Sequence, residues 1–264
     1  MRIATWNINS VRLRMPLLLR LIEEARPDVI CLQETKVIDD SFPRKELTAA
    51  GYAHLHVHGM KSYNGVAILS RLPFESADIK HWCDREDCRH VMATLPGGIE
   101  LHSVYIPAGG DIPDPEANPK FAHKLRFVDE MTAWLAAERN PKKPMVLVGD
   151  LNIAPLESDV WSHKQLLDVV SHTPIEVEKL TAMQRSVNWV DAVRHFVPPD
   201  QKLYTWWSYR AADWAASDRG RRLDHIWVTP PLKPKLRATG VLRDARGWEP
   251  KPSDHVPVWI DLEI

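Results

Sequence analysis

The sequence predicts an α/β protein built from stacked layers of helix and sheet. Short, wholly apolar runs such as residues 29–32 and 145–148 are typical of strands that are covered on both faces. Longer segments between such runs, for example residues 121–139, repeat their apolar residues at helical spacing. No Gly/Ser linker or low-complexity tract interrupts this alternation, so we expect residues 1–264 to form one domain.

The N-terminal part begins with a predicted strand and helix. β-branched and aromatic residues over 2–8 indicate a strand. Pro16 suits the first turn of a helix, and Pro27 ends it. Next we expect a short helix that begins near Pro43 and ends at Gly51. Further strands are predicted at residues 52–58, 65–70, 91–95 and 99–105, with a tight turn at 96–98.

The C-terminal part continues the alternation. A loop over 107–119, rich in Pro, Gly and Asp, precedes the 121–139 helix. Thr173 and Glu176 form a capping-box pattern around Pro174, which predicts the start of another helix. The final strands are predicted at residues 204–209, 223–228, 237–242 and 256–263.

The composition excludes several classes of protein. Of 264 residues, 44% are hydrophobic and 26% charged, which are ordinary globular values and exclude a disordered tail, a collagen-like fibre and a coiled coil. No apolar run approaches the roughly 20 residues that cross a bilayer, so we expect no membrane association. The N-terminus has no apolar leader segment, so we do not expect secretion.

The cysteines and histidines raise two metal-site alternatives. Three cysteines are too few for a disulfide scaffold. Cys83 and Cys88, with His81 and His90, could nominally bind zinc, but their spacing fits no usual zinc pattern, so we expect free thiols. The alternating histidines of residues 54–58 could bind nickel or zinc, and we expect a solvated strand face instead.

The charge is unevenly distributed although the net charge is only −1. Residues 201–252 hold 11 basic and 5 acidic side chains, whereas residues 150–200 hold 4 basic and 8 acidic ones. A polarised chain of this kind can bind a polyanion on one face. Trp206 and Trp207 lie inside the basic stretch, where aromatic rings beside cations suit nucleic acid.

Polar side chains gather where the predicted strands end or begin, which is where α/β sheets bind ligands. Carboxylate and amide oxygens are the ligands that Mg²⁺ or Mn²⁺ prefers, and a single histidine beside carboxylates suits phosphoryl transfer to water. The sequence has no Walker loop, no G-x-G-x-x-G and no G-x-S-x-G, which disfavours nucleoside triphosphate, dinucleotide and serine-hydrolase chemistry. The residues at these strand ends are Asn7, Glu34, Asp150, Asn152, Asp224, Asp254 and His255.

Seven motifs carry a family resemblance. They are residues 5–9 (TWNIN), 27–36 (PDVICLQETK), 104–107 (VYIP), 149–152 (GDLN), 206–210 (WWSYR), 222–224 (RLD) and 252–257 (PSDHVP). With these motifs the chain resembles the exonuclease III family of abasic-site endonucleases, which belongs with deoxyribonuclease I to the endonuclease/exonuclease/phosphatase superfamily. The motifs span almost the whole chain.

The resemblance implies a four-layered α/β sandwich in which helices flank two central mixed β-sheets. It implies Mg²⁺-dependent hydrolysis, with Mn²⁺ as a substitute, of the phosphodiester 5′ to abasic sites in double-stranded DNA. It also implies 3′→5′ exonuclease activity and cleaning of blocked 3′ ends. A monomer in a bacterial-type cytoplasm, associated with the nucleoid, is expected.

The resemblance further assigns roles to residues of the metal site. Glu34 is the principal metal ligand, with Asn7 and Asp254 as helpers. Asp150 positions or deprotonates the attacking water. These roles agree with the oxygen-rich chemistry of the strand-end residues.

Other roles concern the phosphate. Asn152 holds the scissile phosphate, and Tyr105 contacts it together with the leaving side. His255, paired with Asp224, contacts a phosphate oxygen in the transition state.

Substrate contacts are expected from pocket walls and basic groups. Trp206 and Leu223 are expected to line a pocket for the sugar that lacks its base, because an abasic nucleotide leaves the duplex at little cost. The other expected substrate-binding residues are Asn9, Lys120, Lys124, Trp207 and Arg210.

Two positions depart from the family pattern, and two other functions stay open. Ala108 stands where the family has Gln or Asn, and Arg221 where it often has an apolar pocket residue; both bear on substrate preference. One alternative is a superfamily phosphoesterase that acts on a phosphoinositide or on sphingomyelin. The other is a DNA-binding protein without catalysis, although a binder has little use for clustered carboxylates facing a polyanion.

Overall fold

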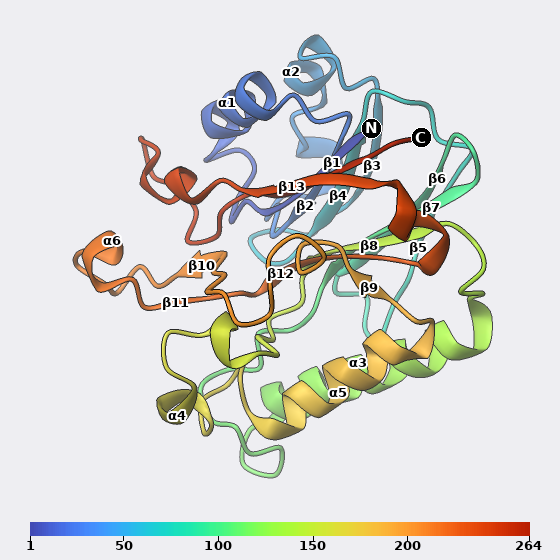
Figure 1. Ribbon diagram of the computed structural model, residues 1–264. Coiled ribbons are helices and arrows are strands. Elements are labelled where there is room, and N and C mark those ends of the chain that lie inside the picture. The colour runs from blue at the N-terminus through green and yellow to red at the C-terminus, as the bar shows by residue number, and fades with distance from the viewer.

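The computed structural model describes residues 1–264 and shows two six-stranded sheets that pack face to face between helices (Figure 1). The first sheet has the strand order β13-β14-β1-β2-β4-β3, the second β5-β6-β7-β8-β12-β9, and β10 pairs with β11 in a separate ribbon. The strands are β1 (Arg2–Asn7), β2 (Val29–Gln33), β3 (His54–His58), β4 (Val66–Ser70), β5 (Ser76–Ile79), β6 (His90–Leu95), β7 (Ile99–Tyr105), β8 (Met145–Asp150), β9 (Val190–Asp191), β10 (Trp206–Trp207), β11 (Gly220–Arg221), β12 (Asp224–Val228), β13 (Leu236–Val241) and β14 (Val258–Leu262).

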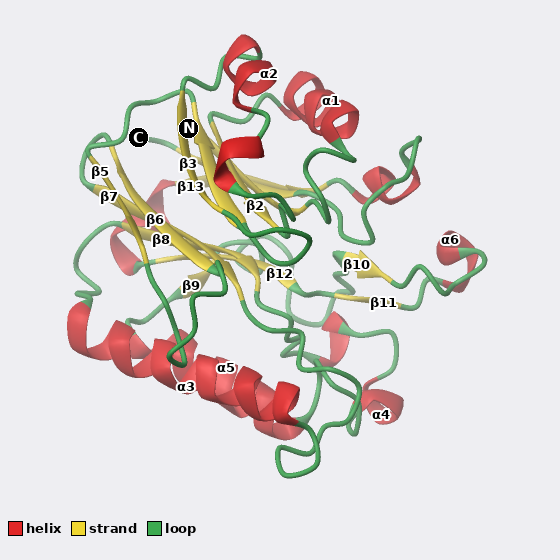
Figure 2. Cartoon of the chain, turned by 180° about the vertical axis from the view of Figure 1, so that it is seen from behind, coloured by secondary structure: helices red, strands yellow, loops and turns green.

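Helices cover the outer faces of both sheets, as the view from behind also shows (Figure 2). α1 and α2 lie on the first sheet, and α3 and α5 lie on the second. The helices are α1 (Met15–Ala25), α2 (Arg44–Ala49), α3 (Pro119–Glu138), α4 (His163–Leu166), α5 (Pro174–Ser186) and α6 (Trp214–Ser217), with 3₁₀ segments at Asp39–Ser41, Glu157–Asp159, Pro230–Lys235 and Arg243–Gly247.

Each sheet contains one parallel pair, and this pair positions the functional side chains. β1 and β2 are parallel and connected through α1, while β7 and β8 are parallel and connected through α3. All other pairs in the two sheets are antiparallel, so both sheets are mixed. Parallel neighbours end at the same edge of their sheet, which brings the residues that follow them close together.

Three apolar clusters hold the layers together. The cluster between the sheets includes Ile3, Val148 and Ile260, all fully buried. A second cluster joins the first sheet to α1, whose buried residues Leu17, Leu18, Leu21, Ile22 and Ala25 follow the predicted helical spacing. A third joins the second sheet to α3 and α5. The four-layered sandwich with two mixed sheets and flanking helices is thereby confirmed.

Local predictions succeeded where turn and capping chemistry is explicit. Thr173 caps α5, and Glu176 completes the capping box as its sequence pattern predicts. Gly97 and Gly98, at φ +86° and +70°, form the turn between β6 and β7. In β14 the buried residues alternate with partly exposed ones.

Other local predictions need correction. β5 was not predicted, because all four of its residues are exposed and carry no alternating pattern. The strand predicted at residues 204–209 is reduced to Trp206–Trp207. The cysteines are free thiols, as predicted, and all three are buried. None of the helices is both long and apolar enough to cross a membrane.

A buried histidine pair links β6 to β7. His90 Nε2 and His102 Nδ1 lie 3.0 Å apart and share a hydrogen bond, and both residues are fully buried. Burial lowers the pKa of both imidazoles; for His90 the neighbouring His102 adds to this effect, whereas for His102 the Glu100 carboxylate partly opposes it. The folded state therefore keeps this pair neutral over a range in which exposed histidines bind a proton.

We expect acid to destabilise the protein through this pair. Because the pKa values are lowered in the folded state, the unfolded chain binds more protons below about pH 6.5, so the stability present above that pH is lost as pH falls. Urea unfolding between pH 7.5 and 5.5 should show a decline that is shallower by about 1 kcal/mol in His90→Gln than in the parent. The matched control is His195→Gln, at an exposed position. An equal decline in parent and His90→Gln contradicts this account.

Candidate active site

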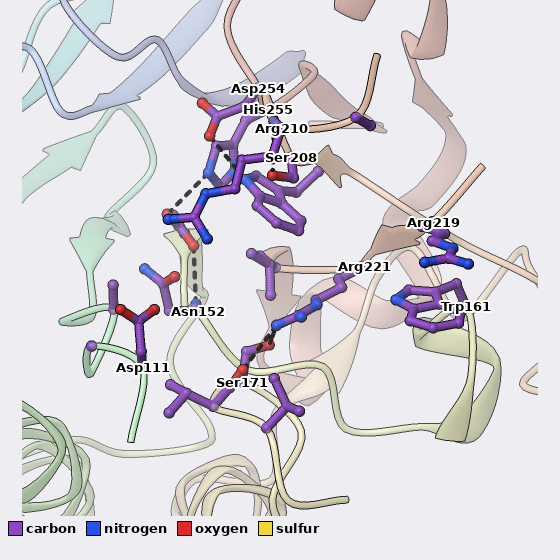
Figure 3. Close-up of a pocket in the computed structure, with 18 of the residues that line it drawn as sticks. Asp111, Asn152, Trp161, Ser171, Ser208, Arg210, Arg219, Arg221, Asp254 and His255 are labelled. Carbon is purple, nitrogen blue, oxygen red and sulfur yellow. Dashed lines mark hydrogen bonds and ion pairs between the residues drawn. The ribbon is translucent and has the colours of Figure 1, made fainter. Parts of the chain in front are cut away.

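The polar residues that follow the parallel pairs meet at the adjacent edges of the two sheets. Asn7 ends β1, Glu34 follows β2, Tyr105 ends β7 and Asp150 ends β8. Asp224 begins β12, where the antiparallel register places it directly opposite Asp150. The segment before β14 adds two further polar residues, Asp254 and His255 (Figure 3). Polar residues that lie as far apart in the sequence as Asn7 and His255 thus meet in one candidate site.

Asn7 connects the two sheets at this place. It is fully buried, and its Nδ2 donates to Glu34 Oε1 and to Asp150 Oδ2, at 2.9 Å each. One amide group therefore lies between two carboxylates that come from different sheets. The partly positive amide hydrogens thus compensate the buried carboxylate of Asp150 and the partly buried one of Glu34.

Glu34 is held as a carboxylate by its neighbours. Lys36 Nζ lies 2.7 Å from Glu34 Oε2, and the Tyr105 hydroxyl donates to Oε1 at 2.9 Å. Burial opposes ionisation, but the Lys36 ammonium and the Asn7 hydrogen bond outweigh it and lower the pKa of Glu34. Burial and the negative charges of Glu34 and Asp150 raise the pKa of Tyr105 well above its usual value, so its hydroxyl stays a donor.

Asp150 and His255 form the centre of the site. Asp150 Oδ2 lies 3.6 Å from His255 Nε2, and both residues are at most 5% exposed. Burial and the charge of Asp224 raise the pKa of Asp150 to about 7, although His255 opposes this rise. Burial alone disfavours the imidazolium, but Asp224 and Asp150 outweigh it and raise the pKa of His255 to about 10. His255 is thus a cation at neutral pH.

Asp224 orients His255 from behind. His255 Nδ1 donates to Asp224 Oδ2 at 2.8 Å, which leaves Nε2 directed at Asp150. The Thr205 hydroxyl donates to the same Oδ2 at 2.6 Å and accepts from the backbone N–H of Asp224. Asp224 Oδ1 is buried without a hydrogen-bond partner. This orphaned oxygen adds to the excess of negative charge in the site.

Asn152 is fixed by its backbone and by its side chain. Its φ is +54°, a conformation that Asn tolerates better than most residues, and its N–H donates to Asp150 Oδ1 at 3.0 Å. Its Nδ2 donates to the Ile106 carbonyl at 2.9 Å. The amide is therefore held beside the carboxylate, between the loops that follow β7 and β8.

The buried acids suit a cation. Atoms of Asp150, Asp224 and His255 lie within 4.8 Å of one another and form a cluster consistent with a metal site. His255 Nδ1 is already a donor to Asp224, so the oxygens are the better ligands. The buried Asp150 and Asp224 and the partly buried Glu34 are three carboxylates, and only Lys36 and His255 are nearby cations. The remaining negative charge is one that a hard divalent ion would balance.

A pocket of about 880 Å³ opens beside these groups (Figure 3). Glu34, Tyr105, Asp150, Asn152, Asp254 and His255 line one part of it. The predicted wall residues Trp206 and Leu223, and the exposed Arg210, also line it. Trp206 is oriented by a hydrogen bond from its Nε1 to Asp254 Oδ2 at 2.9 Å. The predicted acids Glu34, Asp150 and Asp254 therefore share one cavity with the predicted pocket walls.

Asn9 lies at the rim beside Asp254. Its Nδ2 donates to Asp254 Oδ1 at 3.2 Å, and its Oδ1 accepts from Lys36 Nζ at 2.6 Å. It thereby connects the Lys36 ammonium to the loop before β14. Asp254 faces the pocket but is bound to neutral donors, Asn9 and Trp206.

Two expected substrate contacts are wrong, and a third lies apart. Lys124 is fully buried, and its ammonium lies 2.5 Å from Glu176 Oε1, so it cannot reach a phosphate at the surface. Trp207 is 2% exposed and packs in the cluster beneath the first sheet. Lys120 is exposed at the start of α3 but does not line the pocket. The prediction for Lys124 rested on its basic side chain alone, and it failed because this position of α3 faces the interior.

Lys124 has a structural role instead. Its Nζ donates to the Asn152 carbonyl at 2.8 Å, and its partner Glu176 also accepts from the N–H groups of Ser171 and Thr173. The ion pair thus joins α3 and α5 to the loop that carries Asn152. The capping-box pattern predicted that Glu176 lies at the start of a helix, but it did not indicate the ion pair with Lys124.

Sequence reasoning missed several residues of the pocket. Trp161 and Ser171 line it, as does Arg219, whose guanidinium stacks on Trp161 at 4.6 Å from the ring centroid. Arg221 was noted only as a departure from the family pattern. The excess of Trp and Arg in this region was the available signal.

Several known proteins are similar to this chain over its full length. The Endonuclease/Exonuclease/phosphatase family pattern matches residues 4–255. Exodeoxyribonuclease III of Haemophilus influenzae is 32% identical over the full length of both chains. Two solved structures are 30% identical over the full length of both chains: an AP endonuclease from Archaeoglobus fulgidus, with a TM-score of 0.92, and the 3′ phosphatase NExo from Neisseria bound to a product DNA hairpin, with a TM-score of 0.91.

Removing the Lys124 ammonium should weaken the fold. Lys124→Met leaves Glu176 buried without its cation, so we expect the free energy of unfolding to fall by about 3 to 5 kcal/mol. Lys124→Met combined with Glu176→Gln should recover part of this loss, because the uncompensated charge is gone. Urea unfolding measures both. The matched control is Lys179→Met, whose pair with the half-exposed Asp129 should cost under about 1 kcal/mol. Equal losses in the two single variants contradict the assigned role.

Proposed function

The chain belongs to the exonuclease III/AP endonuclease family within the endonuclease/exonuclease/phosphatase superfamily, and from this premise we propose that it incises double-stranded DNA at the phosphodiester 5′ to abasic sites. It is a phosphodiesterase nuclease of the exonuclease III type. The proposal includes 3′→5′ exonuclease activity and cleaning of blocked 3′ ends. The observation that carries it is the convergence of Asn7, Glu34 and Asp150 beside His255 in a cationic, aromatic pocket.

The cofactor we propose is Mg²⁺, with Mn²⁺ as a substitute. Glu34 would hold it, with help from the oxygens of Asn7 and Asp254, since these side chains offer the hard ligands that Mg²⁺ prefers. When bound, the ion neutralises charge on the phosphate and polarises its oxygens. The excess of buried carboxylate around Asp150 and the unpartnered Asp224 Oδ1 support a cation here.

The protein groups then divide the work of hydrolysis. Asp150 orients the attacking water and accepts its proton. His255, kept protonated by Asp224, donates from Nε2 to a phosphate oxygen as negative charge develops. Asn152 holds another phosphate oxygen, and the Tyr105 hydroxyl contacts the phosphate on the leaving side. The phosphorus to O3′ bond breaks, and a 3′-hydroxyl remains.

The pocket supports selection of abasic nucleotides. Trp206 and Leu223 offer apolar walls for a sugar without its base, which costs less to extrude than an intact nucleotide. Arg210 and Asn9 at the rim, and Lys120 outside it, would contact the DNA backbone without reading sequence. We place this activity in a monomer in the bacterial cytoplasm at the nucleoid.

The alternative substrates are less well supported. The relatives named above are called an exodeoxyribonuclease, an AP endonuclease and a 3′ phosphatase bound to DNA, which favours DNA over a lipid headgroup. A binder without catalysis would gain nothing from buried carboxylates beside a polyanion.

The first test is metal-dependent incision. A duplex oligonucleotide with one tetrahydrofuran abasic analogue should be cut directly 5′ to the analogue when Mg²⁺ is present. EDTA should abolish the cut, and Mn²⁺ should restore it. Denaturing gel electrophoresis measures the product, with the same duplex without the analogue as control. Incision that persists in EDTA, or no incision with either metal, would overturn the proposal.

The second test removes the proposed acceptor of the water proton. We expect Asp150→Asn to lower kcat for incision by at least about 10³-fold, as is typical for an essential group, while affinity for the abasic duplex persists. Single-turnover kinetics and fluorescence anisotropy separate the two quantities. Asp129→Asn, at an exposed position on α3, is the matched control. Incision by Asp150→Asn at the parent rate would falsify the role given to Asp150.

A further inference from the structure

Arg221 is an arginine of the pocket wall whose charge has no protein partner. It lies in β11 opposite Trp206, and its guanidinium carbon is 5.4 Å from the centroid of the Trp206 ring. Its two hydrogen bonds both come from Nη1, to the Val170 carbonyl at 2.8 Å and to Ser171 Oγ at 2.7 Å. Nε is buried without a partner, and Nη2 makes no hydrogen bond. Figure 3 shows the side chain reaching toward Ser171, away from Asp254 and His255.

The neighbouring residue shows what a structural arginine looks like in this chain. Arg222 is buried, whereas Arg221 is partly buried, and Arg222 pairs with Asp159 at 2.8 Å and with Asp191 at 2.6 Å. Arg221 forms no ion pair with any carboxylate. Even the partial burial of a cation without a counter-charge costs free energy, and the two neutral acceptors of Arg221 compensate only part of that cost. The remaining need is for an anion on the pocket side.

Part of the pocket is cationic and lies away from the acids. Figure 3 shows Arg219 and Arg221 with Trp161 on the side away from Asp254 and His255, whereas Arg210 lies beside those two residues. Neither Arg219 nor Arg221 forms an ion pair with a carboxylate, so this part of the pocket can accept an anion from outside. The Nη2 group, which has no partner in the protein, can donate a charged hydrogen bond to an oxygen of a carboxylate or phosphate.

The proposed function places the scissile phosphate at the acid part of the pocket, and the inference rests on that placement. We propose that Arg221 is a specificity-determining residue that binds a second anionic group, attached to the scissile phosphate on the pocket side. Two substrates carry such a group. A blocked 3′ end can carry a glycolate carboxylate, and an abasic nucleotide carries the next backbone phosphate.

The reaction itself is unchanged by this contact. Water adds to phosphorus, the phosphorus to O3′ bond breaks, and O3′ takes up a proton. The phosphoryl group leaves together with its pocket-side fragment, glycolate or deoxyribose phosphate. Arg221 holds that fragment and so selects between substrates that share one scissile bond.

The test compares matched substrates that differ only in the second anion. One pair has a 3′-phosphoglycolate end and the neutral 3′-phospho-2-hydroxyethyl end. The other pair has a tetrahydrofuran site followed by a normal phosphate or by a methylphosphonate. We expect the parent to prefer the anionic member of at least one pair by about ten-fold in kcat/KM, in keeping with one charged hydrogen bond.

The variants separate the charge from the structural contacts. Arg221→Gln keeps a donor for Val170 and Ser171 but removes the charge, so it should lose the preference. Arg221→Lys keeps the charge without the fork and should retain part of it. Arg237→Gln, an exposed position on β13, should behave as the parent. Thermal unfolding verifies that each variant is folded.

The outcomes distinguish the two proposals. Loss of preference in the glycolate pair identifies a carboxylate ligand, and loss in the abasic pair identifies the backbone phosphate. A parent without preference in either pair, or Arg221→Gln with both preferences intact, overturns the role of Arg221. A parent that hydrolyses none of the four substrates with Mg²⁺ defeats the proposed function instead.

Discussion

The structure depends on the concentration of negative charge at the meeting edges of two sheets. Asp150 and Asp224 belong to two strands and Glu34 follows a third; the two aspartates are buried, and the Glu34 side chain is 20% exposed. Burial disfavours the charged form of these carboxylates and their mutual repulsion adds to the cost; burial first, and then the charge of Asp224, raise the pKa of Asp150 to about 7. The surrounding groups exist to hold this arrangement in place: the Asn7 amide between two of the acids, and His255 between Asp150 and Asp224.

The fold supplies the support from outside the site. Gly149, at φ +144°, lets β8 approach β7 so closely that a side chain there would meet the Val104 carbonyl. Beneath the site, the Lys124–Glu176 pair joins α3 and α5 to the Asn152 loop. Two buried ion pairs of Arg222 hold the strand that carries Asp224. The same excess of acid that makes the site costly to fold makes it suited to a divalent cation, because the ion would balance the negative charge.

The architecture and the acid centre could be predicted from the sequence. Predictions failed where tertiary burial determines which way a side chain faces. Apolar runs and the capping box at Thr173 gave elements close to those observed, because they depend on neighbouring residues. The strand-end positions of Glu34 and Asp150 predicted their convergence, since parallel strands end together. Lys124 and Trp207 were wrongly predicted to contact the substrate, because their burial depends on tertiary packing. The lack of a carboxylate partner for Arg221 also depends on tertiary packing, so no sequence pattern could indicate it.

The central claim is that the acids around Glu34 and Asp150 hold a divalent cation. Binding of Mn²⁺ tests this claim without any substrate. Electron paramagnetic resonance of free Mn²⁺ gives the dissociation constant for the parent and for Glu34→Gln, a change that keeps the size of the side chain and removes its charge. The account predicts binding to the parent that Glu34→Gln weakens at least about ten-fold, as expected when a metal site loses a ligand charge. Equal binding by the two proteins, or none by the parent, would contradict it.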